Sequence, residues 1–229
     1  ALGRAGRARV NATIIGITGS VGKTSTKGAL YAALERSCRG RVHRSVRSYN
    51  NHTGVPLSLA RMPRETRFAV LEMGMNHAGE LAALTRLVRP NVALITAIAS
   101  AHREYFDSEE AIADAKGEIF EGFEPGGTAI LPHDSPHRGR LLARADRHAE
   151  RILTFGLGEG ADVHASYVLR SPRGGTMMTA HLPGAQLSFT VGQPGEHWAA
   201  NALAVLAAVD AVGGDLAAAG LPLADLGGL

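Results

Sequence analysis

The stretch Thr13-Ile-Ile-Gly-Ile-Thr-Gly-Ser-Val-Gly-Lys-Thr-Ser25 decides the fold of this chain. It opens with an apolar run typical of a short buried strand, and residues 24–35 predict a helix with Leu30, Ala33 and Leu34 on one side. A glycine-containing turn joins the two. A strand, a turn and a helix in this order begin an α/β unit.

The alternation of apolar runs and helical patterns continues along the chain, and near residue 152 it changes to shorter alternating runs. We therefore expect an α/β fold: a mostly parallel sheet flanked by helices, with a small antiparallel flap or edge sheet. The further strands are expected at 68–73, 92–98, 128–131, 176–182 and 186–191, and the further helices at 80–88, 108–120, 137–150 and 197–212.

Composition limits the class of protein. The chain has 229 residues, 45% of them hydrophobic, and one cysteine, Cys38. No window approaches the roughly 18 consecutive apolar residues of a membrane span, and the first residues lack the apolar run of a signal peptide. A single cysteine excludes an internal disulfide and a cysteine-based zinc site, so we expect a reducing cytoplasm and no membrane partner.

The net charge of +3 is unevenly distributed, because residues 1–47 hold ten Lys and Arg and one acid. A nucleic acid, a phosphorylated small molecule and a solvated surface each explain such a basic end. Only 5% of the residues are aromatic, and few of them interleave the arginines. No nucleic-acid motif occurs, so we expect no nucleic-acid partner.

A candidate phosphate loop lies directly after the first strand. In such a loop, glycines let backbone N–H groups approach phosphate oxygens, the lysine reaches the β- and γ-phosphates, and the threonine ligates Mg²⁺. Ile17 stands where the general pattern has glycine, so the match is to a shorter Thr-Gly-x-x-Gly-Lys-Thr variant. The alternative is a glycine-rich turn with an exposed lysine. The candidate nucleotide-binding residues are Gly19, Ser20, Val21, Gly22, Lys23, Thr24 and Ser25.

Two further side chains are candidates for a metal site. Glu72 ends a predicted strand, where a parallel sheet places its ligand crevice, and His102 follows the next strand. Mg²⁺ prefers oxygen ligands, which fits Glu72 and Thr24 better than a histidine. Alternatively, Glu72 is a capping or salt-bridged carboxylate and His102 a loop histidine.

Lys116 is predicted to border the inward face of a helix, because apolar residues lie before it and at i+3 and i+4 after it. A partly buried lysine tends to lose its proton, and a neutral amine can react with carbon dioxide to form a carbamate. The alternative is a lysine whose stem packs on the surface while its amine reaches water.

Five stretches, in this order, resemble the Mur ligases, the ATP-dependent amide-forming enzymes of peptidoglycan synthesis. The resemblance runs from about residue 10 to residue 212. The stretches are Thr18 to Thr24, Tyr49-Asn-Asn-His-Thr-Gly-Val-Pro-Leu57, Glu72-Met-Gly-Met-Asn-His-Ala-Gly-Glu80, Asp114-Ala-Lys-Gly-Glu-Ile119 and Gly195-Glu-His-Trp-Ala-Ala-Asn-Ala-Leu203.

The resemblance implies that residues 1–229 are the family's central ATPase domain, without its N-terminal UDP-binding and C-terminal Rossmann-like domains. It favours the branch that adds D-alanyl-D-alanine to UDP-N-acetylmuramoyl-tripeptide through an acyl phosphate, with the isolated domain binding ATP but catalytically incomplete. Folylpolyglutamate or cyanophycin synthetases and a non-catalytic nucleotide-binding module are the alternatives. Trp198 replaces a second asparagine found in many relatives.

The resemblance also implies ATP and two Mg²⁺ ions as cofactors, and it implies roles for individual residues. By resemblance, the catalytic residues are Lys23, Lys116 and His102; the metal ligands are Thr24, Glu72, His102 and a carbamylated Lys116; Asn201 contacts adenine; and Asn51 and Thr53 contact the muramoyl-peptide substrate.

Overall fold

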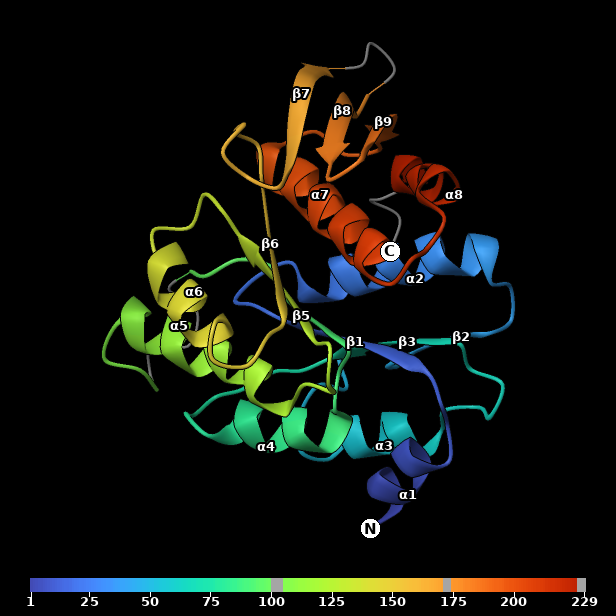
Figure 1. The fold of residues 1–229 in the computed structure, drawn as a ribbon, viewed down its shortest axis with the longest axis vertical. Helices are drawn as coiled ribbons and strands as arrows, with labels where there is room; N and C mark the ends of the chain where they lie inside the picture. Colours follow the sequence, from blue (N-terminus) through green and yellow to red (C-terminus); the bar gives the residue numbers. More distant parts are fainter. Residues whose placement is uncertain (100–104, 171–173, 226–229) are drawn as a thin grey trace.

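Strand β1, the strand of the opening stretch, lies within a single sheet that is covered by helices on both faces (Figure 1). The computed structural model describes residues 1–99, 105–170 and 174–225. Its strands are β1 (Thr13–Thr18), β2 (Val42–Arg44), β3 (Phe68–Glu72), β4 (Val92–Ile95), β5 (Thr128–Pro132), β6 (Arg151–Gly156), β7 (Val163–Arg170), β8 (Thr176–Leu182) and β9 (Ala185–Val191). Its helices are α1 (Leu2–Ala8), α2 (Lys23–Ser37), α3 (Gly54–Ala60), α4 (Glu80–Val88), α5 (Glu109–Gly117), α6 (Arg138–Ala145), α7 (Glu196–Ala211) and α8 (Leu216–Gly220), with 3-10 turns η1 (Glu118–Gly122) and η2 (Pro222–Asp225).

The sheet confirms the predicted fold class. Its strand order is β2-β3-β1-β4-β5-β6-β7-β8-β9. Neighbouring strands from β2 to β7 are parallel, whereas β7, β8 and β9 pair antiparallel at one edge. Because β1 is an interior strand, parallel to both neighbours, and the chain order reverses between β3 and β4, its carboxyl end opens into the crevice where α/β sheets bind ligands.

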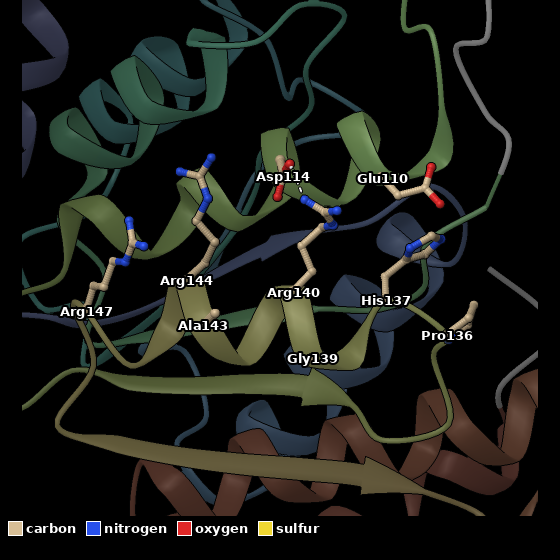
Figure 2. A pocket seen from close by; sticks show the side chains of 9 residues that line it. All are labelled: Glu110, Asp114, Pro136, His137, Gly139, Arg140, Ala143, Arg144 and Arg147. Carbon is tan, nitrogen blue, oxygen red and sulfur yellow. Dashed lines mark hydrogen bonds and ion pairs between the residues drawn. The ribbon is translucent and has the colours of Figure 1, made fainter.

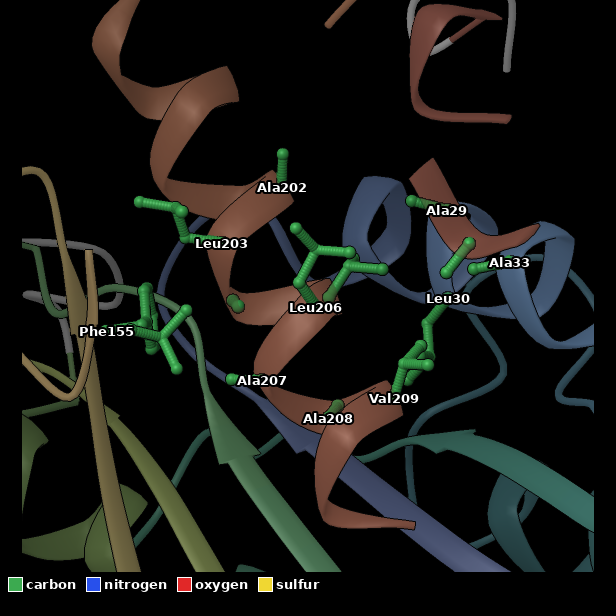
Figure 3. Packing of buried hydrophobic residues seen from close by; sticks show 14 of the residues in the cluster. Ala29, Leu30, Ala33, Phe155, Ala202, Leu203, Leu206, Ala207, Ala208 and Val209 are labelled. Carbon is green, nitrogen blue, oxygen red and sulfur yellow. The ribbon is translucent and has the colours of Figure 1, made fainter. Parts of the chain in front are cut away.

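Two apolar cores cover the two faces of the sheet. Successive residues of β1 alternate between them: Ile15 and Ile17 pack with α2 and α7, and Ile14 packs with the helices of the opposite face. Figure 3 shows Leu30 of α2 beside Leu206 and Val209 of α7. Burying a side chain of this size contributes about 1.5–3 kcal/mol, so these contacts fix α2, and with it the phosphate loop, on the sheet.

The helix predicted over 108–120 ends early. α5 stops at Gly117 and the chain continues as the 3-10 turn η1. The Glu118 carboxylate accepts hydrogen bonds from the backbone N–H groups of Gly79 (2.8 and 3.0 Å) and Ala82 (3.2 Å), so it caps α4. This capping contact connects distant parts of the chain, and no local pattern predicts it.

Several elements were not predicted, among them α1, β2, α3, β6 and β7. The strand β2, with three residues, and the helices α1 and α3, with seven, are too short for their periodicity to be recognised. The strands β6 and β7 are longer, and they lie where the sequence shows only short alternating runs. The other strand and helix boundaries differ from the predicted ones by a few residues, and the predicted helix over 137–150 is shortened to α6.

The structure also describes the one cysteine and the apolar character of the helices. Cys38 is a free thiol buried in the core, with 5% of its surface exposed. Among the described residues, no helix has the length and apolar character needed to cross a bilayer.

Candidate functional site

The phosphate loop joins β1 to α2 as predicted, and it is fixed to the end of β4. The Ser20 N–H donates to the carbonyl of Ala97 (2.7 Å), and the Thr96 hydroxyl donates to the carbonyl of Val21 (2.6 Å). Gly22 has φ +85° and precedes the first residue of α2. This left-handed conformation is one that glycine adopts without strain. These contacts and the glycine conformation give the loop a defined shape.

Lys23 begins α2 and curls back over the loop. Its Nζ donates to the carbonyls of Gly19 (2.7 Å) and Ser20 (3.3 Å). Burial lowers the pKa of Lys23, and the nearby Glu72 opposes that shift. These two contacts place the Lys23 ammonium against the loop, and its contact with the β- and γ-phosphates stays a prediction.

Glu72 is the centre of a buried polar cluster at the end of β3. Its carboxylate accepts from the Thr24 hydroxyl (3.0 and 3.2 Å), from Lys27 Nζ (3.0 Å) and from Asn50 Nδ2 (2.9 Å). Its backbone N–H donates to Ser45 Oγ (3.1 Å). Glu72 is therefore salt-bridged, as the alternative interpretation has it. The same cluster places its carboxylate beside the Thr24 hydroxyl, which the sequence predicts to ligate Mg²⁺.

The side-chain oxygen atoms of this cluster fit a magnesium ion. Thr24 Oγ1 and the Glu72 carboxylate are oxygen ligands at hydrogen-bond distance from each other, and Mg²⁺ uses few protein oxygens together with substrate phosphates and water. Across the described ranges, no group of three or more His, Cys, Asp or Glu side chains forms a metal cage. His102 lies outside the described residues.

Lys116 is buried, with 1% of its surface exposed, and is among the largest side chains enclosed by the protein. Burial, reinforced by the like charge of Lys23, lowers its pKa to about 7. The prediction of an inward-facing lysine is confirmed, and the alternative of a surface lysine is wrong. The neutral amine is therefore accessible near physiological pH, unlike that of an ordinary lysine.

A comparison with protein families matches residues 17–209 to the Mur ligase middle domain. The chain belongs to the Mur ligase family. The match covers the phosphate loop, Glu72 and Lys116, so the buried cluster belongs to the matched domain of this Mur ligase chain.

Individual relatives narrow the branch of the family. The chain is 39% identical over 195 residues to the UDP-N-acetylmuramoyl-tripeptide--D-alanyl-D-alanine ligase of Bacillus subtilis, covering 85% of this chain and 40% of that protein. MurF from Acinetobacter baumannii has the same fold (TM-score 0.91, 32% identity, 100% of this chain and 49% of that one). MurF from Thermotoga maritima, solved in complex with ADP, also matches (TM-score 0.81, 26% identity, 100% and 51%). The Mur ligase chain thus spans about half the length of these relatives.

Asn201 of α7 lies against the phosphate loop. A Cβ built on Gly22 would stand 3.1 Å from both the Nδ2 and the Oδ1 atoms of Asn201. The amide is thus next to the loop expected to hold the nucleotide, which is compatible with the predicted adenine contact without testing it. Trp198 is half-buried, packs on the core beneath α7 and has its ring 5.5 Å from that of His197.

The residues predicted to contact the substrate lie near a cavity of about 510 Å³. Asn51 lines it, but its Oδ1 also accepts from the backbone N–H groups of Thr53 (3.1 Å) and Gly54 (2.9 Å) and so fixes the turn before α3. Thr53 does not line this cavity. The lining residues are Asn50, Asn51, His52, Gly74, Met75, Asn76, Glu80, Ala83 and Leu84.

Another cavity, of about 580 Å³, lies between α5 and α6 and contains none of the predicted site residues (Figure 2). Arginines of α6 face acidic residues of α5 across it, and Arg140 donates to Asp114 at 2.9 Å. Because charges of both signs already pair here, it is not a candidate for the nucleotide site.

Sequence reasoning missed Lys27 and Asn50, which hold the Glu72 carboxylate. Lys27 lies three residues after Thr24 on a helix that was predicted, and i,i+3 spacing puts both side chains on one face. That spacing was the available signal. Asn50 was seen only as part of a polar turn, and nothing local indicates that its amide contacts Glu72.

Proposed function

We propose that this chain is the ATP-binding part of a ligase that joins D-alanyl-D-alanine to UDP-N-acetylmuramoyl-tripeptide. The observation that carries the proposal is the cluster of Lys23, Thr24 and Glu72 at the phosphate loop. The names of the relatives supply the substrates: those proteins are UDP-N-acetylmuramoyl-tripeptide--D-alanyl-D-alanine ligases.

The first chemical step would be phosphoryl transfer. A carboxylate oxygen of the peptide attacks the γ-phosphorus of ATP, the bond to the β-phosphate oxygen breaks, and an acyl phosphate and ADP result. The loop N–H groups and Lys23 would position the phosphates and offset charge that develops in transfer. Thr24 and Glu72 would hold a Mg²⁺ ion, which supplies further neutralisation of the phosphate oxygens when bound.

The second step would be attack by the amine of D-alanyl-D-alanine on the acyl carbon. A C–N bond forms, inorganic phosphate leaves with its oxygen, and the amine releases a proton. This step needs no nucleophile from the protein. The one cysteine, Cys38, is buried in the core, which agrees with a reaction that uses no thiol.

Lys116 would act as a carbamate. Its neutral amine attacks the carbon of carbon dioxide, a C–N bond forms as one C=O π bond opens, and the nitrogen releases a proton, so that the neutral amine becomes an anionic carbamate. We propose that this group, with His102, completes a second Mg²⁺ site. The burial of Lys116 and its lowered pKa support the first part of this proposal.

We further propose that the chain functions within a longer protein that has a UDP-binding domain before it and a Rossmann-like domain after it. The chain covers 40% of the Bacillus subtilis ligase, which supports this organisation. ATP and a UDP-linked precursor are cytoplasmic metabolites, so the proposed reaction takes place there and serves cell-wall synthesis, and through it cell shape and division.

The test is a ligation assay with the full-length protein, ATP, Mg²⁺ and both substrates. Phosphate release should require UDP-N-acetylmuramoyl-tripeptide and D-alanyl-D-alanine together, and Lys23→Ala should reduce kcat at least 100-fold, a typical loss when one charge-stabilising donor is removed. Turnover with a folate or an amino-acid polymer instead would support the alternative ligases. Nucleotide binding without turnover would support a binding module, and salt-sensitive DNA binding a nucleic-acid partner.

A further inference from the structure

A separate cavity of about 360 Å³ lies between α2 and the segment that follows β2. Thr24, Lys27 and Gly28 line it from the helix, and their i, i+3, i+4 spacing places them on one face of α2. The opposite wall consists of Arg44, Ser45, Val46 and Arg47. The cavity therefore begins at the proposed magnesium ligand Thr24 and extends along the helix away from the phosphate loop.

The cavity is lined by positive charge. Of the described residues around it, three are cationic and none is acidic. Lys27 is neutralised by Glu72. Neither Arg44 nor Arg47 forms an ion pair with a carboxylate in the described part of the chain. Two guanidinium groups beside a cavity, neither paired with a carboxylate, favour an anionic occupant. Charge-assisted hydrogen bonds from arginine to a carboxylate or phosphate are stronger than hydrogen bonds between neutral groups.

The Arg44 guanidinium packs against Tyr31 of α2. Its Cζ lies 4.2 Å from the centroid of the Tyr31 ring, a cation–π geometry. Tyr31 is seven residues after Thr24 and so belongs to the same face of α2. A guanidinium that is already restrained loses less entropy when it binds an anion.

Arg47 has a strained backbone. Its φ is +49°, in the left-handed region that costs a non-glycine residue about 1–2 kcal/mol. Lys27 Nζ donates to its carbonyl, so the buried ion pair holds this conformation in place. A strained exposed residue that is fixed by a buried one points to a role other than stability.

We propose that Arg44 and Arg47 bind an anionic group, a phosphate or a carboxylate, of the UDP-linked peptide substrate. This inference rests on the proposed function. The ATP phosphates are assigned to the loop at residues 18–24. The segment bearing both arginines continues into Asn50, Asn51 and His52, which line the cavity near the predicted substrate residues. The segment 44–52 would thus contact the UDP-linked peptide in both cavities, through the two arginines in one and through residues 50–52 in the other.

The test compares Arg44→Ala and Arg47→Gly in the full-length protein. Glycine tolerates the positive φ, so Arg47→Gly removes the guanidinium without adding strain, and it serves as the second variant if Arg44→Ala folds poorly. Arg39→Ala, at an exposed arginine outside the cavity, is the matched control. The KM for UDP-N-acetylmuramoyl-tripeptide should rise about 10-fold or more in both variants. The KM values for ATP and D-alanyl-D-alanine should stay within about twofold of the control.

Calorimetric titration with UDP, with Mg²⁺ and a non-hydrolysable ATP analogue saturating the loop, separates the two sources of the anion. Weaker UDP binding in the variants identifies a phosphate, and unchanged UDP binding with a raised substrate KM identifies a carboxylate. A substrate KM equal to that of Arg39→Ala, or a change confined to ATP or D-alanyl-D-alanine, overturns the inference. A wild-type protein that ligates no UDP-linked peptide contradicts the proposed function itself.

Discussion

Lys27 and Glu72 form a buried ion pair, with Nζ 3.0 Å from Oε2 and only 4% and 1% of their side chains exposed. Lys27 comes from α2 and Glu72 from the end of β3, so the pair connects the helix of the phosphate loop to the neighbouring strand. Through the Arg47 carbonyl, Lys27 also holds the segment that leads to the substrate-side cavity. The Lys27 ammonium therefore connects α2, the end of β3 and the segment that contains Arg47.

Replacing Lys27 by methionine should destabilise the protein by about 3–5 kcal/mol, because it leaves the Glu72 carboxylate buried without its cation. Urea denaturation gives the free energy of unfolding. The double variant Lys27→Met/Glu72→Gln should lose less than Lys27→Met alone, since it no longer contains the uncompensated charge. A loss below about 0.5 kcal/mol for the single variant would show that the pair contributes little to stability.

Stability should rise with pH above 7 because of Lys116. Its folded pKa is about 7 against 10.5 for an ordinary lysine, so between these values the unfolded chain binds more protons than the folded one. The free energy of unfolding then increases with pH, by at most about 1.4 kcal/mol per unit from this group, and the gain is lost as pH falls towards 7.

Denaturation at pH 7, 8 and 9 in CO₂-free buffer checks this, with Lys116→Met as the reference that lacks the amine. The wild-type slope should exceed that of the variant. Equal slopes would mean that Lys116 keeps its proton in the folded protein. If the wild-type slope is the larger one, adding ¹³C-bicarbonate to the wild type should produce a carbamate carbon resonance that Lys116→Met lacks.

The sequence predicted what depends on neighbouring residues and failed where distant segments meet. The phosphate loop lies within a few residues of its strand and helix, and the inward position of Lys116 follows from its apolar neighbours at i+3 and i+4. The contact of Lys27 with Glu72 crosses 45 positions, and Asn50 reaches the same carboxylate from a loop. The basic first 47 residues likewise gave no indication that Arg44 and Arg47 line one cavity.

Thr24→Val should weaken nucleotide binding only when Mg²⁺ is present. The Thr24 side chain is exposed, so removing its hydroxyl should cost the fold little, but it removes the proposed oxygen ligand and the hydrogen bond to Glu72. Fluorescence titration with an ATP analogue should show the affinity gained on adding Mg²⁺ falling about 10-fold or more. Thr24→Ser, which keeps the hydroxyl, should restore it. If the two variants gain equally from Mg²⁺, Thr24 is not a ligand.

Gly22→Ala should impair the nucleotide site more than its backbone strain explains. A methyl group at Gly22 meets both an unfavourable φ of +85° and the Asn201 amide at 3.1 Å. Gly40 provides the matched control, because its φ is +75° and nothing lies within 4 Å of its Cβ position. Gly40→Ala should therefore report strain alone, about 1–2 kcal/mol by denaturation, and leave ATP-analogue affinity unchanged.

Gly22→Ala should cost more stability than Gly40→Ala and should also weaken ATP-analogue binding, because Asn201 or the loop must move to accommodate the methyl group. Adding Asn201→Ala to Gly22→Ala should recover the excess loss of stability by removing the crowded amide, without relieving the strain. Equal losses for the two glycine variants, with no recovery in the double variant, would mean that the Asn201 amide moves aside freely. In that case the close approach of α7 to the loop would not constrain the nucleotide site.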